Sequence, residues 1–155
     1  MLRRGLAAIP GVRLLGPGLD AETLPVAAFT VDGVPHALVA ARLAAEEAIG
    51  VRHGCFCAHP YLMRLLDHTR EDVHRYREQV RRGDRSAMPG AVRASAGINT
   101  TGEDIQRLLA AVARIARGNP PPVPYQQDLR TGDFRPGGDA GLGRPDSHQA
   151  PCSPG

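Results

Sequence analysis

Hydrophobic positions along most of the chain follow the periods of short strands and amphipathic helices. Apolar runs at 12–15 and 25–31 predict two strands, the second rich in β-branched and aromatic residues. Apolar residues at helical spacing over 38–48 predict a helix that Gly50 ends. A short strand is expected from Val51, directly before a cluster of chemically reactive residues.

The same patterns continue beyond that cluster. We expect a short helix from about Pro60, a helix over 69–83 capped by Thr69 and Asp72, a strand at 91–96 and a helix over 101–117. The last helix has a continuous apolar stripe, and Thr100 with Glu103 fits a capping box. This order of elements predicts an α+β fold, a small mixed sheet with helices packed on one face.

Composition changes abruptly at Gly118. The 38 residues from there to Gly155 include eight prolines and seven glycines, and their apolar residues are isolated. Such a segment buries too little apolar surface to offset the entropy of ordering it. We therefore predict one folded domain over 1–117 and a disordered Pro/Gly-rich tail over 118–155.

All of the side-chain positive charge comes from 19 arginines, because the sequence contains no lysine. Sixteen carboxylates reduce the formal net charge to +3, a mixed surface that does not by itself indicate nucleic-acid binding. No apolar run is long enough for a membrane-spanning helix, and the first residues lack a signal-peptide core. With so few cysteines a disulfide framework is not expected, so we predict a cytoplasmic protein without a membrane partner.

The segment 52–60, Arg-His-Gly-Cys-Phe-Cys-Ala-His-Pro, holds the densest group of reactive side chains. Cys57 directly precedes a predicted helix, whose free N–H groups favour a nucleophilic thiolate. A second interpretation is a zinc site, with ligands His53, Cys55, Cys57 and His59. Their spacing argues against it, because ligands at alternate positions of one extended stretch do not converge easily. Burial of one or both cysteines as small apolar residues is a third interpretation.

Several motifs in this order resemble one enzyme family. The run 54–60, Gly-Cys-Phe-Cys-Ala-His-Pro, is followed by Val-Arg-Ala-Ser at 92–95 and by Asn99-Thr100 at the start of a helix. With the strand-helix context upstream, they resemble the C-terminal small domain of class V aminotransferase-fold enzymes over about residues 5–117. Within that superfamily the motifs are most similar to those of the group II cysteine desulfurases.

The resemblance implies an enzyme that depends on pyridoxal phosphate. In the family, cysteine binds the cofactor, a protein thiolate attacks the substrate sulfur, and alanine leaves behind a persulfide. The nucleophile implied by motif position is Cys57, directly before Ala58-x-Pro60, and Arg93 is the implied bidentate anchor for the substrate carboxylate. Taken without the resemblance, Arg93 is better interpreted as a surface arginine on a strand of an Arg-rich protein. Other class V members catalyse transamination or epimerisation, so those activities remain alternatives. For Cys55 there are two interpretations: it resolves a disulfide or sulfenate at Cys57, or it only packs against neighbouring side chains.

The family needs a large domain with a Schiff-base lysine, and this sequence has none. We therefore interpret the chain as a truncated or split fragment that is inactive alone and binds no pyridoxal phosphate by itself. A separate large domain chain is the expected partner, in a homo- or hetero-oligomer. The alternative is a non-catalytic binding module, in which the Arg-rich helix at 70–85 contacts an acidic protein or RNA. Against it, Glu71, Asp72 and Glu78 compensate part of the charge, as on an ordinary solvated helix face.

Overall fold

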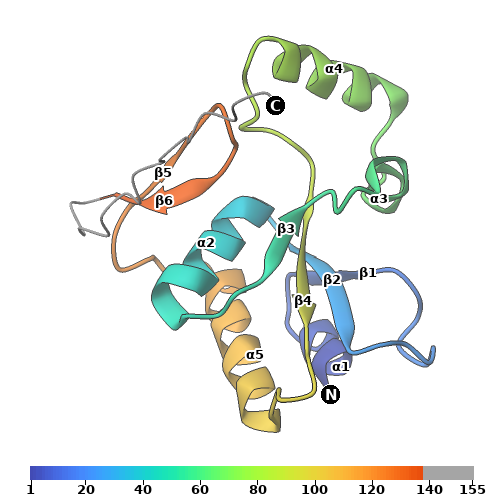
Figure 1. Ribbon diagram of the computed structural model, residues 1–155, viewed down its shortest axis with the longest axis vertical. Helices are drawn as coiled ribbons and strands as arrows, with labels where there is room; N and C mark the ends of the chain where they lie inside the picture. The colour runs from blue at the N-terminus through green and yellow to red at the C-terminus, as the bar shows by residue number, and fades with distance from the viewer. Residues whose placement is uncertain (138–155) are drawn as a thin grey trace, which may run out of the picture.

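The computed structural model describes residues 1–137 and contains a four-stranded sheet in the order β1-β2-β4-β3 (Figure 1). These strands are β1 (Val12–Leu15), β2 (Val26–Val31), β3 (Arg52–Gly54) and β4 (Ala91–Ser95). Each neighbouring pair is antiparallel. The α+β class is thus confirmed, but the sheet is antiparallel rather than mixed, because the chain reverses direction between every two strands that pair.

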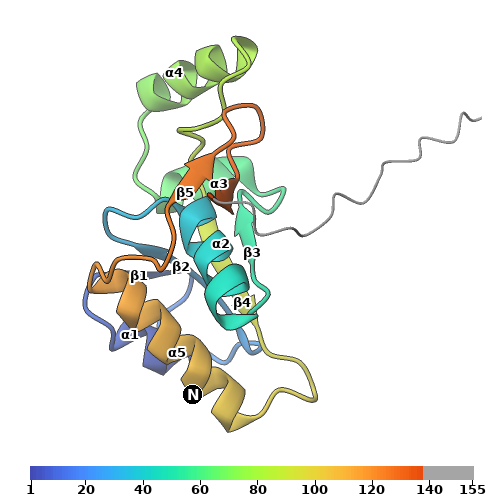
Figure 2. The ribbon, with the colours of Figure 1, turned by 90° about the vertical axis from the view of Figure 1, so that its left-hand side faces the viewer.

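Three helices cover one face of this sheet: α1 (Leu2–Ala7), α2 (His36–Glu47) and α5 (Gly102–Ala116) (Figure 2). The β2 side chains alternate, so that Ala27, Phe29 and Val31 all point into the main core. Leu43 of α2 and Val112 of α5 are fully buried against them. No helix of the described residues is long and apolar enough to cross a membrane.

The other face of the sheet is partly covered, which the sequence did not predict. The short helix α3 (His59–Leu65) buries Leu62 and Met63 against Leu15 of β1 and Ala91 of β4. These strand residues alternate with those of the main core, so they lie on the opposite face. The helices therefore do not all pack on one face. The next helix, α4 (Arg70–Arg81), has no buried residue and stands apart at one end of the molecule.

Side-chain caps fix the ends of two helices. Thr69 and Asp72 form the expected capping box at α4. In α5 the box is formed by Thr101 and Asp104, one residue later than the predicted pair Thr100 and Glu103. The α2 helix ends at Ala48, which takes a left-handed conformation with φ 55°, two residues before the expected Gly50.

The prediction of disorder from residue 118 is wrong for the first part of that segment. Strands β5 (Tyr125–Gln127) and β6 (Phe134–Pro136) pair as an antiparallel hairpin, and β6 lies against α2. Polar contacts hold it: the Tyr125 hydroxyl donates to Glu46 at 3.2 Å, and the Gln127 amide donates to the Ser86 carbonyl at 2.9 Å. These bonds stabilise the hairpin without the burial of a large apolar surface. Residues 138–155 of the predicted tail lie outside the described residues.

Candidate active site

Three of the four residues 54–57, at the end of β3 and in the loop that leads to α3, have a positive φ, which favours glycine. Gly54 has φ 106°, and the two non-glycine residues Phe56 and Cys57 have φ 53° and 58°. The Ala58 N–H donates to the Cys55 carbonyl at 2.9 Å and closes the turn. Each left-handed non-glycine residue costs about 1–3 kcal/mol unless surrounding contacts fix it. Strain of this kind is frequent at functional sites, and in this chain Ala48 and Asp67 also have a positive φ outside the loop.

The turn gives its two cysteines different environments. Cys57 is exposed, whereas Cys55 is half-buried and packs with the cluster around α3. Cys57 lies one residue before the N-cap, Ala58, and α3 has Pro60 in its first turn. The expected position of Cys57 directly before a helix is therefore confirmed, although the helix is only seven residues long. An exposed thiol on a strained turn is open to a reaction partner.

Arg93 of β4 lies on the same face of the sheet as this loop. Its guanidinium carbon is 5.2 Å from the centroid of the Phe56 ring, a cation–π distance. Its Nε atom is buried and has no hydrogen-bond partner among the described residues. A half-buried guanidinium without a counter-charge is costly, and a carboxylate ligand would compensate it. The structure thus brings Arg93 together with the residue that directly precedes Cys57.

A second arginine, missed in the sequence, stands beside Arg93. Arg52 of β3 is the direct cross-strand partner of Arg93, so both side chains leave the same face of the sheet. Two like charges at directly opposite positions destabilise a strand pair. An anion bound between them would relieve that repulsion. In the sequence, Arg52 is only the first residue of the reactive segment 52–60. Its pairing with Arg93 depends on the register between β3 and β4, which local sequence does not reveal.

The four proposed zinc ligands do not form a metal site. Within residues 1–137, no three His, Cys, Asp or Glu side chains are grouped so that they could hold a metal ion. His53 instead points away from the cysteine loop's sulfurs, toward His36 of α2, with 3.3 Å between their Nδ1 atoms. The zinc interpretation therefore has no support in the fold.

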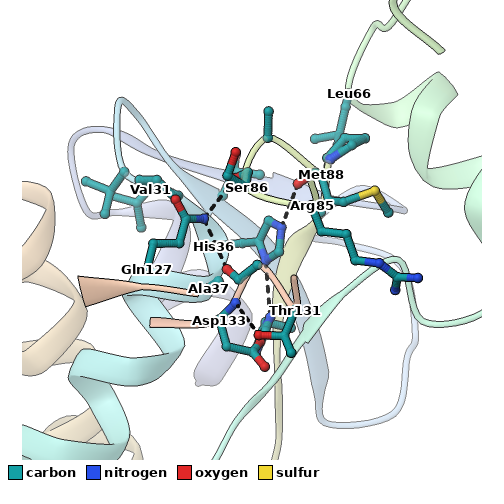
Figure 3. Close-up of a pocket in the computed structure, with 18 of the residues that line it drawn as sticks. Val31, His36, Ala37, Leu66, Arg85, Ser86, Met88, Gln127, Thr131 and Asp133 are labelled. Atoms are coloured by element: carbon teal, nitrogen blue, oxygen red, sulfur yellow. Dashed lines mark hydrogen bonds and ion pairs between the residues drawn. The ribbon is translucent and has the colours of Figure 1, made fainter. Parts of the chain in front are cut away.

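His36 and His53 line a cavity of about 550 Å³ beneath the β5–β6 hairpin (Figure 3). The His36 Nε2 lies 3.0 Å from the Met88 carbonyl, which can only accept, so Nε2 carries a hydrogen. Burial lowers the pKa of His36, which favours the neutral ring with a free lone pair on Nδ1. The His53 Nδ1 then donates to this lone pair across 3.3 Å. The His53 Nε2 lies 3.5 Å from the Asp133 carboxylate, and it attracts that carboxylate when the ring carries a hydrogen on both nitrogens.

This row of side chains ties the hairpin to the strand that leads into the cysteine loop. Neither Cys57 nor Arg93 lines the cavity, so it is separate from the pair that the motifs indicated. Sequence reasoning missed it because His36, His53 and Asp133 come from a helix, a strand and a hairpin far apart in the chain. No local spacing links them.

Comparisons with known proteins relate residues 1–108 to the family described as aminotransferase class-V. A probable cysteine desulfurase of Pseudomonas aeruginosa is 35% identical over 113 residues, covering 73% of this chain and 22% of that protein. Probable cysteine desulfurase 2 of Mycobacterium leprae is 32% identical over 111 residues, covering 71% and 21%. The crystal structure of the cysteine desulfurase CsdA (S-sulfonic acid) from Escherichia coli is 25% identical, with a TM-score of 0.49, covering 75% and 23%. The chain spans about a fifth of the curated relatives it matches.

Proposed function

Because this chain belongs to the class V aminotransferase family, we propose that it supplies the sulfur-accepting thiol and the carboxylate anchor of a cysteine desulfurase. In this proposal Cys57 receives the substrate sulfur as a persulfide, and Arg93 binds the substrate carboxylate. The observation that supports it most is the buried, unpartnered Nε of Arg93 beside the loop of the exposed Cys57.

Arg93 suits a carboxylate because its planar guanidinium offers parallel N–H donors that fix the orientation of the ligand. The Phe56 ring covers one side of the guanidinium and restricts its movement. Arg52, directly opposite, adds a second positive charge that attracts the anion without having to bind it. In this proposal Arg93 binds the substrate carboxylate, Phe56 holds the guanidinium in place, and Arg52 attracts the anion.

Cys57 suits the sulfur-accepting role better than Cys55. A thiol that accepts sulfur from a bound substrate must reach it, and Cys57 is exposed whereas Cys55 packs among apolar side chains. Cys57 is not part of that cluster. Cys55 therefore has a packing role in this proposal.

The family depends on pyridoxal phosphate, but the residues of this chain do not fit that cofactor. A covalent link needs a lysine ε-amine, and no lysine occurs in the sequence. We propose that the lysine and the phosphate site belong to another domain or another chain of the complete enzyme. This chain's own contribution is then limited to binding substrate and accepting sulfur.

A chimera tests the proposal. Residues 1–117 replace the aligned segment of the Pseudomonas aeruginosa relative, whose unmodified form serves as the positive control. Alanine formation from cysteine is measured for the chimera and for its Cys57→Ala, Cys55→Ala, Arg93→Ala and Arg93→Lys variants. We expect Cys57→Ala to abolish turnover and Cys55→Ala to preserve most of it.

The two arginine variants test the anchor. Arg93→Ala should lower kcat/KM by roughly ten- to a hundredfold, since a hydrogen bond to a charged group contributes about 1.5–3 kcal/mol. Arg93→Lys should recover only part of that loss, because a point charge does not reproduce the fork. Full alanine formation by Cys57→Ala would refute the assignment of the thiol, and an unchanged kcat/KM in Arg93→Ala would refute that of the anchor.

A further inference from the structure

A groove of about 640 Å³ runs between α3 and α4, where α4 stands away from the sheet. Its apolar lining, which we call the floor, is formed by Pro60 and Met63 of α3 and by Val73 of α4. None of the α4 residues is buried, so the apolar side of this helix is only partly covered by the described chain. The volume lies within the range of sites that hold small ligands or short peptide segments.

The walls of this groove carry positive charge that the chain does not neutralise. The side chains of Arg64, Arg70 and Arg77 line it, and none of them makes a hydrogen bond or ion pair with any residue among 1–137. The one carboxylate in the lining is Asp67, which is already paired with Arg13 at 3.0 Å. His74 adds a further potential donor.

Arginines elsewhere on α4 behave differently. Arg75 pairs with Asp72, and Arg81 pairs with Glu78 at 2.6 Å, so these charges are compensated within the helix. Within α4 itself, Arg70 and Arg77 have no side-chain partner among residues 1–137, and both line the groove. Arg82, at the C-cap, has no such partner either but lies outside the groove lining.

We propose that the α3–α4 groove binds an acidic segment of a partner protein, with carboxylates on Arg64, Arg70 and Arg77 and an apolar side chain on the floor. Charge complementarity favours an acidic partner, and the apolar floor favours a peptide over a bare anion. Single-stranded RNA is recognised largely by stacking of its bases on aromatic rings. The groove lining contains no Phe, Tyr or Trp for such stacking, and its aromatic rings are the smaller imidazoles of His68 and His74.

This binding does not depend on the desulfurase chemistry. The lining includes neither cysteine of the loop nor Arg93. Substitution of Cys57 or Arg93 should therefore leave peptide binding unchanged. The effect of substituting groove residues is measured as a change in peptide affinity and needs no assay of desulfurase activity. Failure of one proposal can be distinguished from failure of the other.

The test measures binding of a fluorescein-labelled, glutamate-rich peptide with one central leucine to the full chain by fluorescence anisotropy. The groove variant is the double substitution Arg70→Ala and Arg77→Ala. Its matched control is Arg75→Ala with Arg82→Ala, which removes the same charge at the same spacing of seven from the other side of α4. Alanine favours helix, so α4 should persist in both, as circular dichroism would verify.

We expect the groove variant to weaken binding by about tenfold or more and the control by less than about twofold. Arg64→Ala on α3 should also weaken binding, which keeps the test valid if the α4 double variant fails to fold. Equal losses in the two double variants would mean general charge attraction and would overturn the proposal. Absence of peptide binding by the unmodified chain, or tighter binding of a poly-uridine RNA of the same length, would overturn it as well.

Discussion

Gly90 provides the space that the His36 ring occupies. A Cβ atom at position 90 would overlap the imidazole ring, which is held by the Met88 carbonyl. Gly90→Ala should therefore displace the ring and lower the free energy of unfolding by about 1–3 kcal/mol. Chemical denaturation measures this, with Gly50→Ala as the control, because a Cβ there meets no atom within 4 Å. Equal stability of the two variants would contradict this packing.

His36 also makes stability depend on pH. Burial, the largest effect, lowers the pKa of the ring below its ordinary value of 6.5, while the Met88 hydrogen bond and the nearby Asp133 oppose the shift and His53 adds to it. A histidine whose folded pKa is lowered binds its proton more readily in the unfolded chain. Its contribution to stability is therefore present above pH 6.5 and is lost as the pH falls toward the folded value.

The measurement is urea denaturation of the chain and of His36→Gln at about pH 8 and about pH 5. The unmodified chain should lose more stability between these two pH values than the variant does. An identical loss in both would show that His36 does not titrate with folding.

The helices and strands were largely predictable from the sequence, because burial patterns and caps are local. The apolar run of 25–31 and the stripe of 101–117 both correspond to elements of the fold. Two kinds of prediction were wrong. One was the choice of the residue that caps α5, where two local signals are equivalent, and the other was the prediction of disorder for the polar segment that forms the β5–β6 hairpin. Thr100 and Thr101 are each followed three residues later by an acid, and only tertiary placement of α5 decides which one caps it.

Alanine substitutions distinguish these two threonines. The Thr101 side chain accepts the Asp104 N–H and caps α5, so Thr101→Ala should cost about 1 kcal/mol of stability. Thr100 accepts only the exposed Gly97 N–H at 2.9 Å, so Thr100→Ala should cost clearly less. Denaturation midpoints of the two variants give the comparison. A larger loss for Thr100→Ala would place the cap where the sequence had suggested.

The β5–β6 hairpin depends on single polar contacts, so one substitution should loosen it. Asp133→Asn removes the carboxylate that lies 3.5 Å from His53. We expect faster hydrogen exchange of the hairpin amides, including that of Asp128, which donates to the Asp133 carbonyl. Asp20→Asn, at an exposed carboxylate far from the hairpin, is the control. Unchanged exchange in Asp133→Asn would mean that backbone pairing alone holds these strands.

The candidate site was only half predictable, for a physical reason. Cys57 and Arg93 were identified by motif resemblance, since each lies in a recognisable local run. Arg52 acquires its importance from strand register, and the row of His36, His53 and Asp133 from packing of three distant elements. Long-range juxtapositions of this kind have no signature in spacing along the chain.

The absence of lysine leads to a direct expectation about the isolated chain. Incubation with pyridoxal phosphate and reduction with borohydride should attach no cofactor to residues 2–137, because the α-amino group of Met1 is the sole primary amine. Peptide mapping by mass spectrometry checks this. A reduced adduct on an internal residue would contradict the proposed division of the enzyme between this chain and a lysine-bearing part.

The position of the transferred sulfur is the most direct test of the proposed function. The chimera with the Pseudomonas aeruginosa relative is incubated with cysteine, alkylated to trap persulfides and mapped by mass spectrometry. We predict one additional sulfur atom on Cys57, which is exposed, and none on Cys55, which packs beside α3. Sulfur found on Cys55 alone, or alanine formed with no sulfur on Cys57, would contradict the account.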